Sequence, residues 1–340
     1  MADSKRYISK TEFETHKKPD DLWISIQGKI YNVTQWSHHH PGGPLPLLNL
    51  AGQDATDAFI AYHPGIAWQY LDKFFTGYYL EGYLVSDISE DYRKLAVEFS
   101  KMGLFDKKGH GTCILLTIIA LLFFTCVYGV LCCDKTWVHL CCGGLMGFLW
   151  IQSGWIGHDS GHYTVMSNKN LNRLAQLLTG NCLAGISMGW WKWTHNAHHI
   201  ACNSLDFDPD LQHMPFFTFC LNHFSSSVYV GPPNGNDWFE KQTDGTLNIL
   251  CSSWMDWFYG GLQFQVEHHL FPRLPRCHLR TISPFVKELC KKHNLAYNCA
   301  SFWKANAMTI ETLKSAALQA RVLTNAVPKN LVWEAVNTHG

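Results

Sequence analysis

Hydrophobic and polar positions divide the chain into a first part with strand-like alternation and a later part with long apolar runs. Residues 22–33 alternate between apolar and polar side chains on either side of a glycine turn at 27–29, a pattern typical of a β-hairpin. Short helical stretches are indicated at 47–50, 54–61 and 66–75. We therefore expect residues 5–85 to form a small α+β domain.

Two long apolar runs follow a polar linker at residues 86–111. Residues 113–133 and 136–156 contain no Asp, Glu, Lys or Arg, and about 20 apolar residues suffice for a helix to cross a bilayer. Because only Asp134-Lys135 separates the two runs, the pattern predicts a transmembrane hairpin. Three lysines at positions 101, 107 and 108 precede it and favour a cytosolic N-terminus. The chain then returns to the cytosol just before His158.

The remainder of the chain also has helical patterning. Residues 171–191 form an apolar stretch with several glycines, which predicts an interfacial or re-entrant helix, whereas 214–221 is too short to cross a bilayer. Amphipathic patterns at 284–295 and 309–322 predict surface helices. We expect residues 112–322 to form an all-α integral membrane domain, with 323–340 as a tail.

Composition adds two expectations. The net charge is zero, which gives no reason to expect a nucleic-acid partner, but residues 1–91 hold seven basic and twelve acidic side chains. This separation of charge is suited to electrostatic docking between two domains, although an ordinary solvated acidic face gives the same count. The 13 cysteines stand in apolar runs or singly, so we expect reduced thiols that serve as packing residues.

Two histidines in the first domain have the pattern of a haem site. His40 is followed by Pro41-Gly42-Gly43, and His63 stands 23 residues later. A low-spin electron-transfer haem requires two axial ligands that stay bound in both oxidation states, and neutral imidazoles meet this requirement. Residues 5–85 resemble a cytochrome b5 domain. This resemblance implies that His40 and His63 bind haem b.

Three histidine boxes lie in the second domain. They are His158-x-x-x-His162, His195-x-x-His198-His199 and Gln265-x-x-His268-His269. Residues at helical spacings of three and four share one face, so each box directs its side chains toward one point. Seven imidazoles and one amide exceed the needs of one ion, so we expect two. Imidazole suits Fe, Zn, Cu and Ni, and a fused haem donor favours redox-active iron.

The boxes resemble those of membrane fatty-acyl desaturases, and Gln265 together with the cytochrome b5 fusion resembles the front-end desaturases. The segments at 189–194 and 203–211 are most similar to plant sphingolipid long-chain-base Δ8 desaturases, with acyl-lipid Δ6 desaturases as near relatives. That family pattern places a second membrane hairpin between boxes two and three. Here only 69 residues separate His199 from His268, and none of the intervening segments is long enough to span. The resemblance makes His223 a candidate additional ligand.

The resemblance implies an O₂-dependent desaturase in the endoplasmic reticulum membrane. Electrons would pass from NADH through a cytochrome b5 reductase and the fused haem to two irons, with the haem domain and the boxes facing the cytosol. The substrate would be a ceramide or long-chain-base lipid, desaturated at the Δ8 position. An acyl-lipid Δ6-type enzyme, a hydroxylase, and an inactive shortened haem protein tethered to the membrane are the alternatives.

Overall fold

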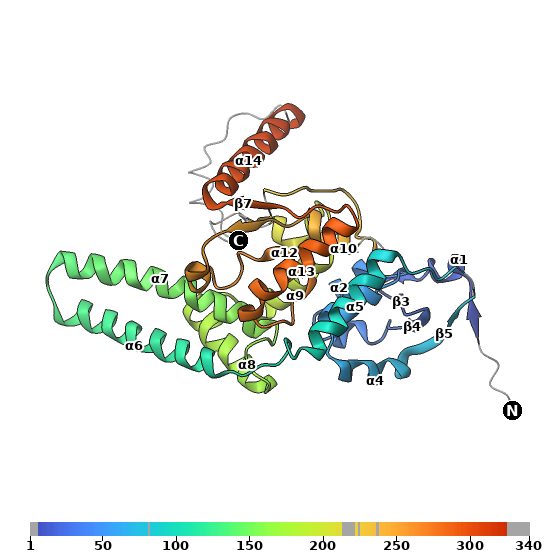
Figure 1. The fold of residues 1–340 in the computed structure, drawn as a ribbon, viewed down its shortest axis with the longest axis horizontal. Helices are drawn as coiled ribbons and strands as arrows, with labels where there is room; N and C mark the ends of the chain where they lie inside the picture. Colours follow the sequence, from blue (N-terminus) through green and yellow to red (C-terminus); the bar gives the residue numbers. More distant parts are fainter. Residues whose placement is uncertain (1–5, 81, 213–221, 224, 236–237, 325–340) are drawn as a thin grey trace.

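The computed structural model describes residues 6–324 apart from residues 81, 213–221, 224 and 236–237. The predicted apolar segment at 214–221 lies outside the described residues. Figure 1 shows a sheet-containing domain at one end, a helical body in the middle and a hairpin of two long helices at the other end.

A five-stranded sheet with the order β1-β5-β4-β3-β2 organises the first domain. Its strands are β1 (Tyr7–Ile8), β2 (Lys17–Lys18), β3 (Asp21–Ile26), β4 (Lys29–Asn32) and β5 (Phe75–Tyr79). Strands β3 and β4 are antiparallel, and Gln27 and Gly28 take φ values of 51° and 74° in the turn between them. These positive φ values are those of a tight hairpin turn. The predicted hairpin is confirmed, whereas strand β5 was not predicted.

Four short helices complete this domain: α1 (Lys10–Phe13), α2 (Leu45–Asn49), α3 (Thr56–Tyr62) and α4 (Trp68–Leu71). The predicted stretches at 47–50 and 54–61 correspond to α2 and α3. The third prediction, 66–75, was too long. Its middle forms α4 between two single 3₁₀ turns, and Phe75 already belongs to β5.

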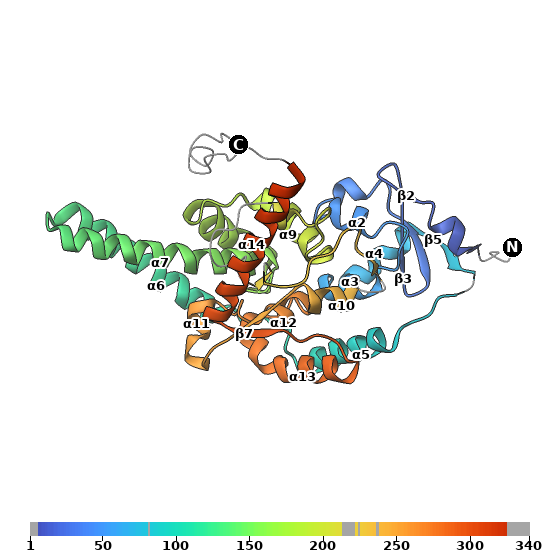
Figure 2. The same cartoon turned by 90° about the horizontal axis from the view of Figure 1, so that it is seen from above.

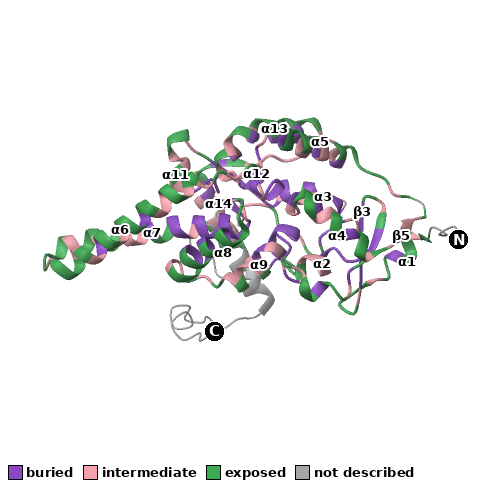
Figure 3. Cartoon of the chain, turned by 90° about the horizontal axis from the view of Figure 1, so that it is seen from below, coloured by how far each residue is buried: buried purple, intermediate pink, exposed green. Residues whose placement is uncertain are grey.

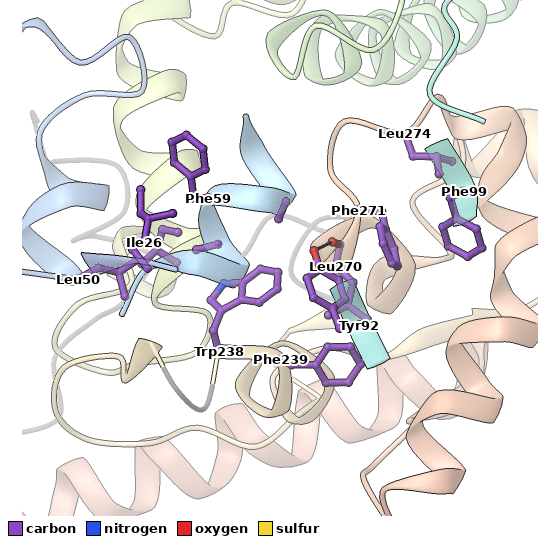
Figure 4. Packing of buried hydrophobic residues seen from close by; sticks show 14 of the residues in the cluster. Ile26, Leu50, Phe59, Tyr92, Phe99, Trp238, Phe239, Leu270, Phe271 and Leu274 are labelled. Carbon is purple, nitrogen blue, oxygen red and sulfur yellow. Dashed lines mark hydrogen bonds between the residues drawn. The ribbon is translucent and has the colours of Figure 1, made fainter. Parts of the chain in front are cut away.

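Helix α5 (Asp87–Lys101) joins the first domain to the helical body within the predicted linker. Ser86 caps it by accepting a hydrogen bond from the Ser89 amide, and its apolar face buries Tyr92 and Phe99 completely. The core around these rings is continuous from the sheet domain to the C-terminal part of the body. Figure 4 shows its labelled members, Ile26, Leu50, Phe59, Tyr92, Phe99, Trp238, Phe239, Leu270, Phe271 and Leu274. The two domains therefore share one hydrophobic core.

Helices α6 (His110–Cys132) and α7 (Thr136–Gly161) form the predicted hairpin. Both are long and apolar enough to cross a membrane. Figure 3 shows that the outer part of the hairpin is exposed and that α7 becomes buried where it enters the body. Apolar side chains such as Phe124 and Leu131 on α6 are largely exposed, which favours a lipid environment.

The apolar stretch predicted as one interfacial or re-entrant helix, 171–191, is divided into several pieces. Helix α8 (Lys169–Gln176) continues into a π-helical segment (Leu177–Leu183), and α9 (Met188–Ile200) begins after a loop. Gly185 lies in that loop with φ of 72°, a conformation that favours glycine, so the chain turns there instead of continuing as a helix.

The C-terminal part adds helices and a short parallel sheet formed by β6 and β7. Its elements are α10 (Trp238–Asp244), β6 (Asn248–Leu250), α11 (Asp256–Tyr259), α12 (Gln265–Leu270), α13 (Leu279–Lys292), β7 (Cys299–Ser301) and α14 (Phe302–Thr324). The predicted starts at 284 and 309 were too late, because α13 and α14 begin at Leu279 and Phe302. Figure 2 shows α14 crossing over the body. The described cysteines are free thiols.

Candidate haem pair and metal centre

His40 and His63 face each other in the first domain. His40 follows a 3₁₀ turn, His63 ends α3, and their ring centroids are 5.9 Å apart. The Nδ1–H group of His40 donates to the Gly43 carbonyl at 2.7 Å, and that of His63 donates to the Phe59 carbonyl at 3.2 Å. The Nε2 atom of each ring is therefore available as a ligand. Imidazole–metal bonds are roughly 2 Å long, so this spacing fits one metal ion between the two rings.

The environment of the pair favours neutral imidazoles. Burial, followed by the neighbouring His40 ring, lowers the pKa of His63 to about 3, and burial also lowers the pKa of His40. Both rings are therefore unprotonated near neutral pH and offer a lone pair to a metal. Gly43, with φ of 82°, ends the tight turn that starts at His40, and we name residues 40–43 the haem loop. A Cβ at Gly43 would meet the Trp193 ring at 2.9 Å. The haem loop is thus packed directly against α9.

The histidine boxes converge in the body. One group contains His158 from α7, His162 directly after the end of α7, His195 and His199 from α9, and His268 from α12. Their ligand atoms all lie within 4.8 Å of one another, and two imidazole nitrogens on opposite sides of one metal stand about 4.2 Å apart. We name these five residues cluster one.

A second group lies beside the first. It contains His198, Cys202, His223 and His269, whose ligand atoms also lie within 4.8 Å of one another, and we name it cluster two. The Nε2 atom of Gln265 lies 3.0 Å from the Nε2 atom of His223 and places the predicted amide at the same point. The His199 and His269 rings, one from each cluster, have centroids 4.2 Å apart. The eleven predicted site residues thus lie in two places, the haem pair and this double cluster.

Outer hydrogen bonds orient the cluster rings. Nδ1 of His198 donates to Asp208 at 2.8 Å, Nδ1 of His195 to Asp210 at 3.3 Å, and Nδ1 of His269 to the Gln242 amide oxygen at 2.8 Å. Such partners fix the tautomer and direct Nε2 toward the cluster. Buried between these rings, Nδ1 of His199 and Nε2 of His268 and His269 have no hydrogen-bond partner among the described residues.

Unpaired buried nitrogens of this kind are rare in native proteins, and a metal ion is one of their explanations. Burial, reinforced by neighbouring imidazoles, lowers the pKa values of His199, His268 and His269 well below the ordinary value. These rings are therefore neutral ligands. In His198, burial is outweighed by Asp208 and Asp210, which raise its pKa to about 9. The same carboxylates favour a metal cation in place of the second proton. The residues present fit a pair of metal ions.

Three polar residues stand inside the histidine boxes, at positions from which they could orient the imidazoles. Asp159 does contact an imidazole, with its Oδ1 3.1 Å from Nδ1 of His158, and it also pairs with Arg276. Asn196 instead donates to the Lys192 carbonyl at 2.7 Å and lies 3.5 Å from the Gly42 carbonyl of the haem loop. Glu267 accepts hydrogen bonds from Asn248 and Tyr297. The last two therefore hold the fold around the boxes.

Sequence reasoning missed Cys202, Asp208 and Gln242. Cys202 stands four residues after His198, which is the same helical spacing that defined the boxes and could have drawn attention to it. Asp208 lies in a loop and Gln242 on α10, and neither position has a periodic relation to the ring that it contacts. The fold brings them there.

Comparisons with known proteins match two parts of the chain to two protein families. Residues 9–80 match the cytochrome b5-like haem/steroid-binding domain, and residues 135–231 and 213–301 match the fatty acid desaturase family. Delta(8)-fatty-acid desaturase 2 of Arabidopsis thaliana is 51% identical over 449 aligned residues that cover all of both chains. From Borago officinalis, a Delta(8)-fatty-acid desaturase and an acyl-lipid (9-3)-desaturase are each 50% identical, again over all of both chains.

These alignments also bear on the length of the chain. The Arabidopsis alignment spans 449 positions, whereas this chain has 340 residues, so at least 109 aligned positions (449 less 340) have no counterpart in it. The two desaturase matches meet at residues 213–231, between boxes two and three. The resemblance described above places a second membrane hairpin between these two boxes. The identities and the two domain matches show that the chain belongs to the fatty acid desaturase family, in the group whose members carry an N-terminal cytochrome b5-like domain.

Proposed function

We propose that this protein is a Δ8 desaturase of sphingolipid long-chain bases. His40 and His63 would hold haem b, cluster one would hold one iron, and cluster two with Gln265 would hold the other. The observation that carries the proposal is the adjacency of the clusters, whose His199 and His269 rings are 4.2 Å apart, beside a haem pair in the same folded unit. When bound, the irons supply O₂ reduction and removal of two hydrogens, with single electrons from the haem.

The chain's own residues orient the ligands and exclude water. Asp208, Asp210 and Gln242 hold three imidazoles by Nδ1, and the cluster residues are buried. A small cleft reaches His158 between α7, the π-helical segment and α9, and its lining includes Gly154, Gly157, Gly180, Ile186, Met188 and Trp191. The lining, which also includes Gln176, is mostly apolar, but the accessible space is only about 20 Å³. The cleft would therefore have to widen to admit a lipid chain beside cluster one. The depth of the chain in such a cleft would select the carbon that reacts.

The cellular setting follows from the same features. The family and the two apolar helices α6 and α7 indicate a membrane protein. We place it in the endoplasmic reticulum with the haem domain and the boxes on the cytosolic side, since lysines 101, 107 and 108 precede α6. An NADH-dependent cytochrome b5 reductase would reduce the haem.

Two alternatives have specific support. The acyl-lipid (9-3)-desaturase of Borago officinalis is as similar as the Delta(8) enzyme of the same plant, so identity does not choose between a sphingoid and an acyl-lipid substrate. The second alternative is a shortened protein that binds haem but does not desaturate lipids. It is supported by the 109 aligned positions that have no counterpart in this chain.

The decisive first measurement is the amount of haem and of non-haem iron per chain in detergent-purified protein. One haem and two non-haem irons are expected, and haem alone would overturn the proposal in favour of a tethered haem protein. Yeast that makes the protein would then receive saturated long-chain bases or saturated and monounsaturated acyl lipids. A new Δ8 double bond in the bases supports the proposal, and a new bond only in acyl lipids supports the alternative.

A further inference from the structure

Tyr62 lies between the haem pair and the metal clusters. It is the last residue of α3, so one peptide bond separates it from His63. Its ring centroid is 5.7 Å from that of His199 in cluster one, with the ring planes at 71°, an edge-to-face contact. One side chain thus touches a metal-cluster ligand and adjoins a haem ligand along the backbone.

Hydrogen bonds fix the backbone on both sides of the contact between Tyr62 and His199. Arg273, four residues after His269, donates to the carbonyls of Ala61 at 3.0 Å and Ile60 at 3.2 Å, which fixes the end of α3. Trp238 donates from Nε1 to the His199 carbonyl at 3.4 Å. Both arrangements belong to the core that the two domains share. The distance between Tyr62 and His199 is therefore set by packing within one rigid unit.

The hydroxyl group of Tyr62 gives no structural reason for a tyrosine at this position. Its oxygen is enclosed and has no hydrogen-bond partner among the described residues. A buried hydroxyl without a partner is destabilising, so folding alone would favour phenylalanine here. Losing an electron would also require the phenol to give its proton to a base, and no described residue accepts a hydrogen bond from the hydroxyl. The ring, and not the hydroxyl, is what the site can use.

We propose that the Tyr62 ring is the electron-transfer contact between the haem and the iron pair, an inference that rests on the function proposed above. In each transfer, one electron leaves the ferrous haem iron, which becomes ferric. It tunnels through His63 and the Tyr62 ring and reduces one ferric non-haem iron to the ferrous state. The ring is not itself oxidised and no proton moves. The NADH-dependent reductase restores the ferrous haem after each transfer.

A second route exists in the structure and must be separated from the first. The Nδ2 atom of Asn196 on α9 lies 3.5 Å from the carbonyl of Gly42, which is two residues after His40. This contact joins the haem loop to box two by a polar side chain at the outer limit of hydrogen bonding. It provides a matched control, because Asn196→Ala removes this one polar contact and leaves the Tyr62 ring and its contact with His199 in place.

The experiment uses the full chain loaded with haem and iron, without O₂, so that no desaturation occurs. A photochemical reductant reduces the haem in a flash, and the haem absorbance then follows its reoxidation by the ferric irons. We expect Tyr62→Phe and Asn196→Ala to keep the wild-type rate and Tyr62→Leu to slow it severalfold. Tyr62→Met, which fills the space with a flexible side chain, serves if the leucine variant does not fold. Haem content, iron content and haem midpoint potential are measured for each variant.

Slower reoxidation in the variants that lack the ring, at unchanged potential and cofactor content, supports the inference. Equal rates in wild type and Tyr62→Met overturn it while the proposed function stands. A slower rate in Asn196→Ala alone assigns the transfer to the Gly42 route and also overturns it. Wild-type protein without non-haem iron, or with no reoxidation of its haem, overturns both proposals.

Discussion

His40 and His63 come from one small domain and are 23 residues apart, whereas the nine residues of the two metal clusters come from α7, α9, α12 and the segments between them. Each haem-pair ring is fixed by a backbone carbonyl three or four residues away along the chain. The cluster rings are fixed mainly by side chains, such as Gln242 against His269 from 27 residues away. A local site tolerates changes elsewhere in the chain, and a site assembled from distant segments depends on the whole body.

This contrast bears on the shortening between boxes two and three. The haem pair does not depend on that region. Cluster two does, because His223 lies at the edge of it and contacts Cys202, Gln265 and the Gly245 carbonyl. In the described part of the chain these contacts are present, and the ligand atoms of each cluster lie within 4.8 Å of one another. This holds although at least 109 positions aligned with the Arabidopsis relative are absent.

The largest expected effect separates the two sites. In His199→Ala, non-haem iron and desaturation should be lost, since this ring belongs to cluster one and adjoins His269 of cluster two. Haem should remain. The complementary variant, His63→Ala, should lose haem and keep non-haem iron. Metal analysis and the Soret absorbance of both variants provide the test, and loss of both cofactors from either variant would contradict the independence of the sites.

A smaller effect is expected from the carboxylate behind His198. Asp208→Asn weakens the hydrogen bond that orients this ring, and such outer partners are worth roughly 10- to 100-fold in metal affinity. Iron retained after dialysis against a graded chelator measures the change. Asp206→Asn is the matched control, because Asp206 is exposed and accepts a hydrogen bond from the Gly231 amide instead of from a cluster residue. Equal iron loss in the two variants would contradict the claim that Asp208 raises the metal affinity by orienting His198.

The shared core can be tested at Arg273. Arg273→Gln leaves the Ile60 and Ala61 carbonyls without their donor, and an unpaired buried group costs about 1–3 kcal/mol. Thermal unfolding followed by haem absorbance should show a lower midpoint. Arg280→Gln breaks a half-exposed pair with Asp256 and should cost no more than about 1 kcal/mol. If the two variants unfold alike, the domains are not coupled through Arg273.

The smallest effect concerns pH at the contact of α5 with α13. Hydrogen bonds from Lys292 and His293 lower the pKa of Asp91 from 3.8 to about 2. A depressed carboxyl pKa stabilises the fold above the unfolded value, and this contribution is lost as the pH falls from about 4 through 2. Asp91→Asn should flatten the dependence of the unfolding midpoint over this range. An unchanged slope would mean that this exposed contact does not stabilise the fold.

Local patterns were sufficient for a large part of this protein. The β3–β4 hairpin, the α6–α7 pair and the spacing within each histidine box follow from interactions between residues a few positions apart, which periodicity records directly. The same is true of His40 and His63, since a turn and a short helix position them. Strand β5 was missed because its pairing with β1 and β4 involves residues more than 40 positions away.

Tertiary structure alone decided how the boxes combine. Periodicity put His198 and His199 on one helix, but only the packing of α7, α9 and α12 assigns them to different clusters. Cys202, Asp208 and Gln242 entered the site in the same way. The contact of Tyr62 with His199 joins residues 137 positions apart in sequence. Side-chain type and local spacing are written in the sequence, whereas the relative placement of distant helices depends on how the whole core packs.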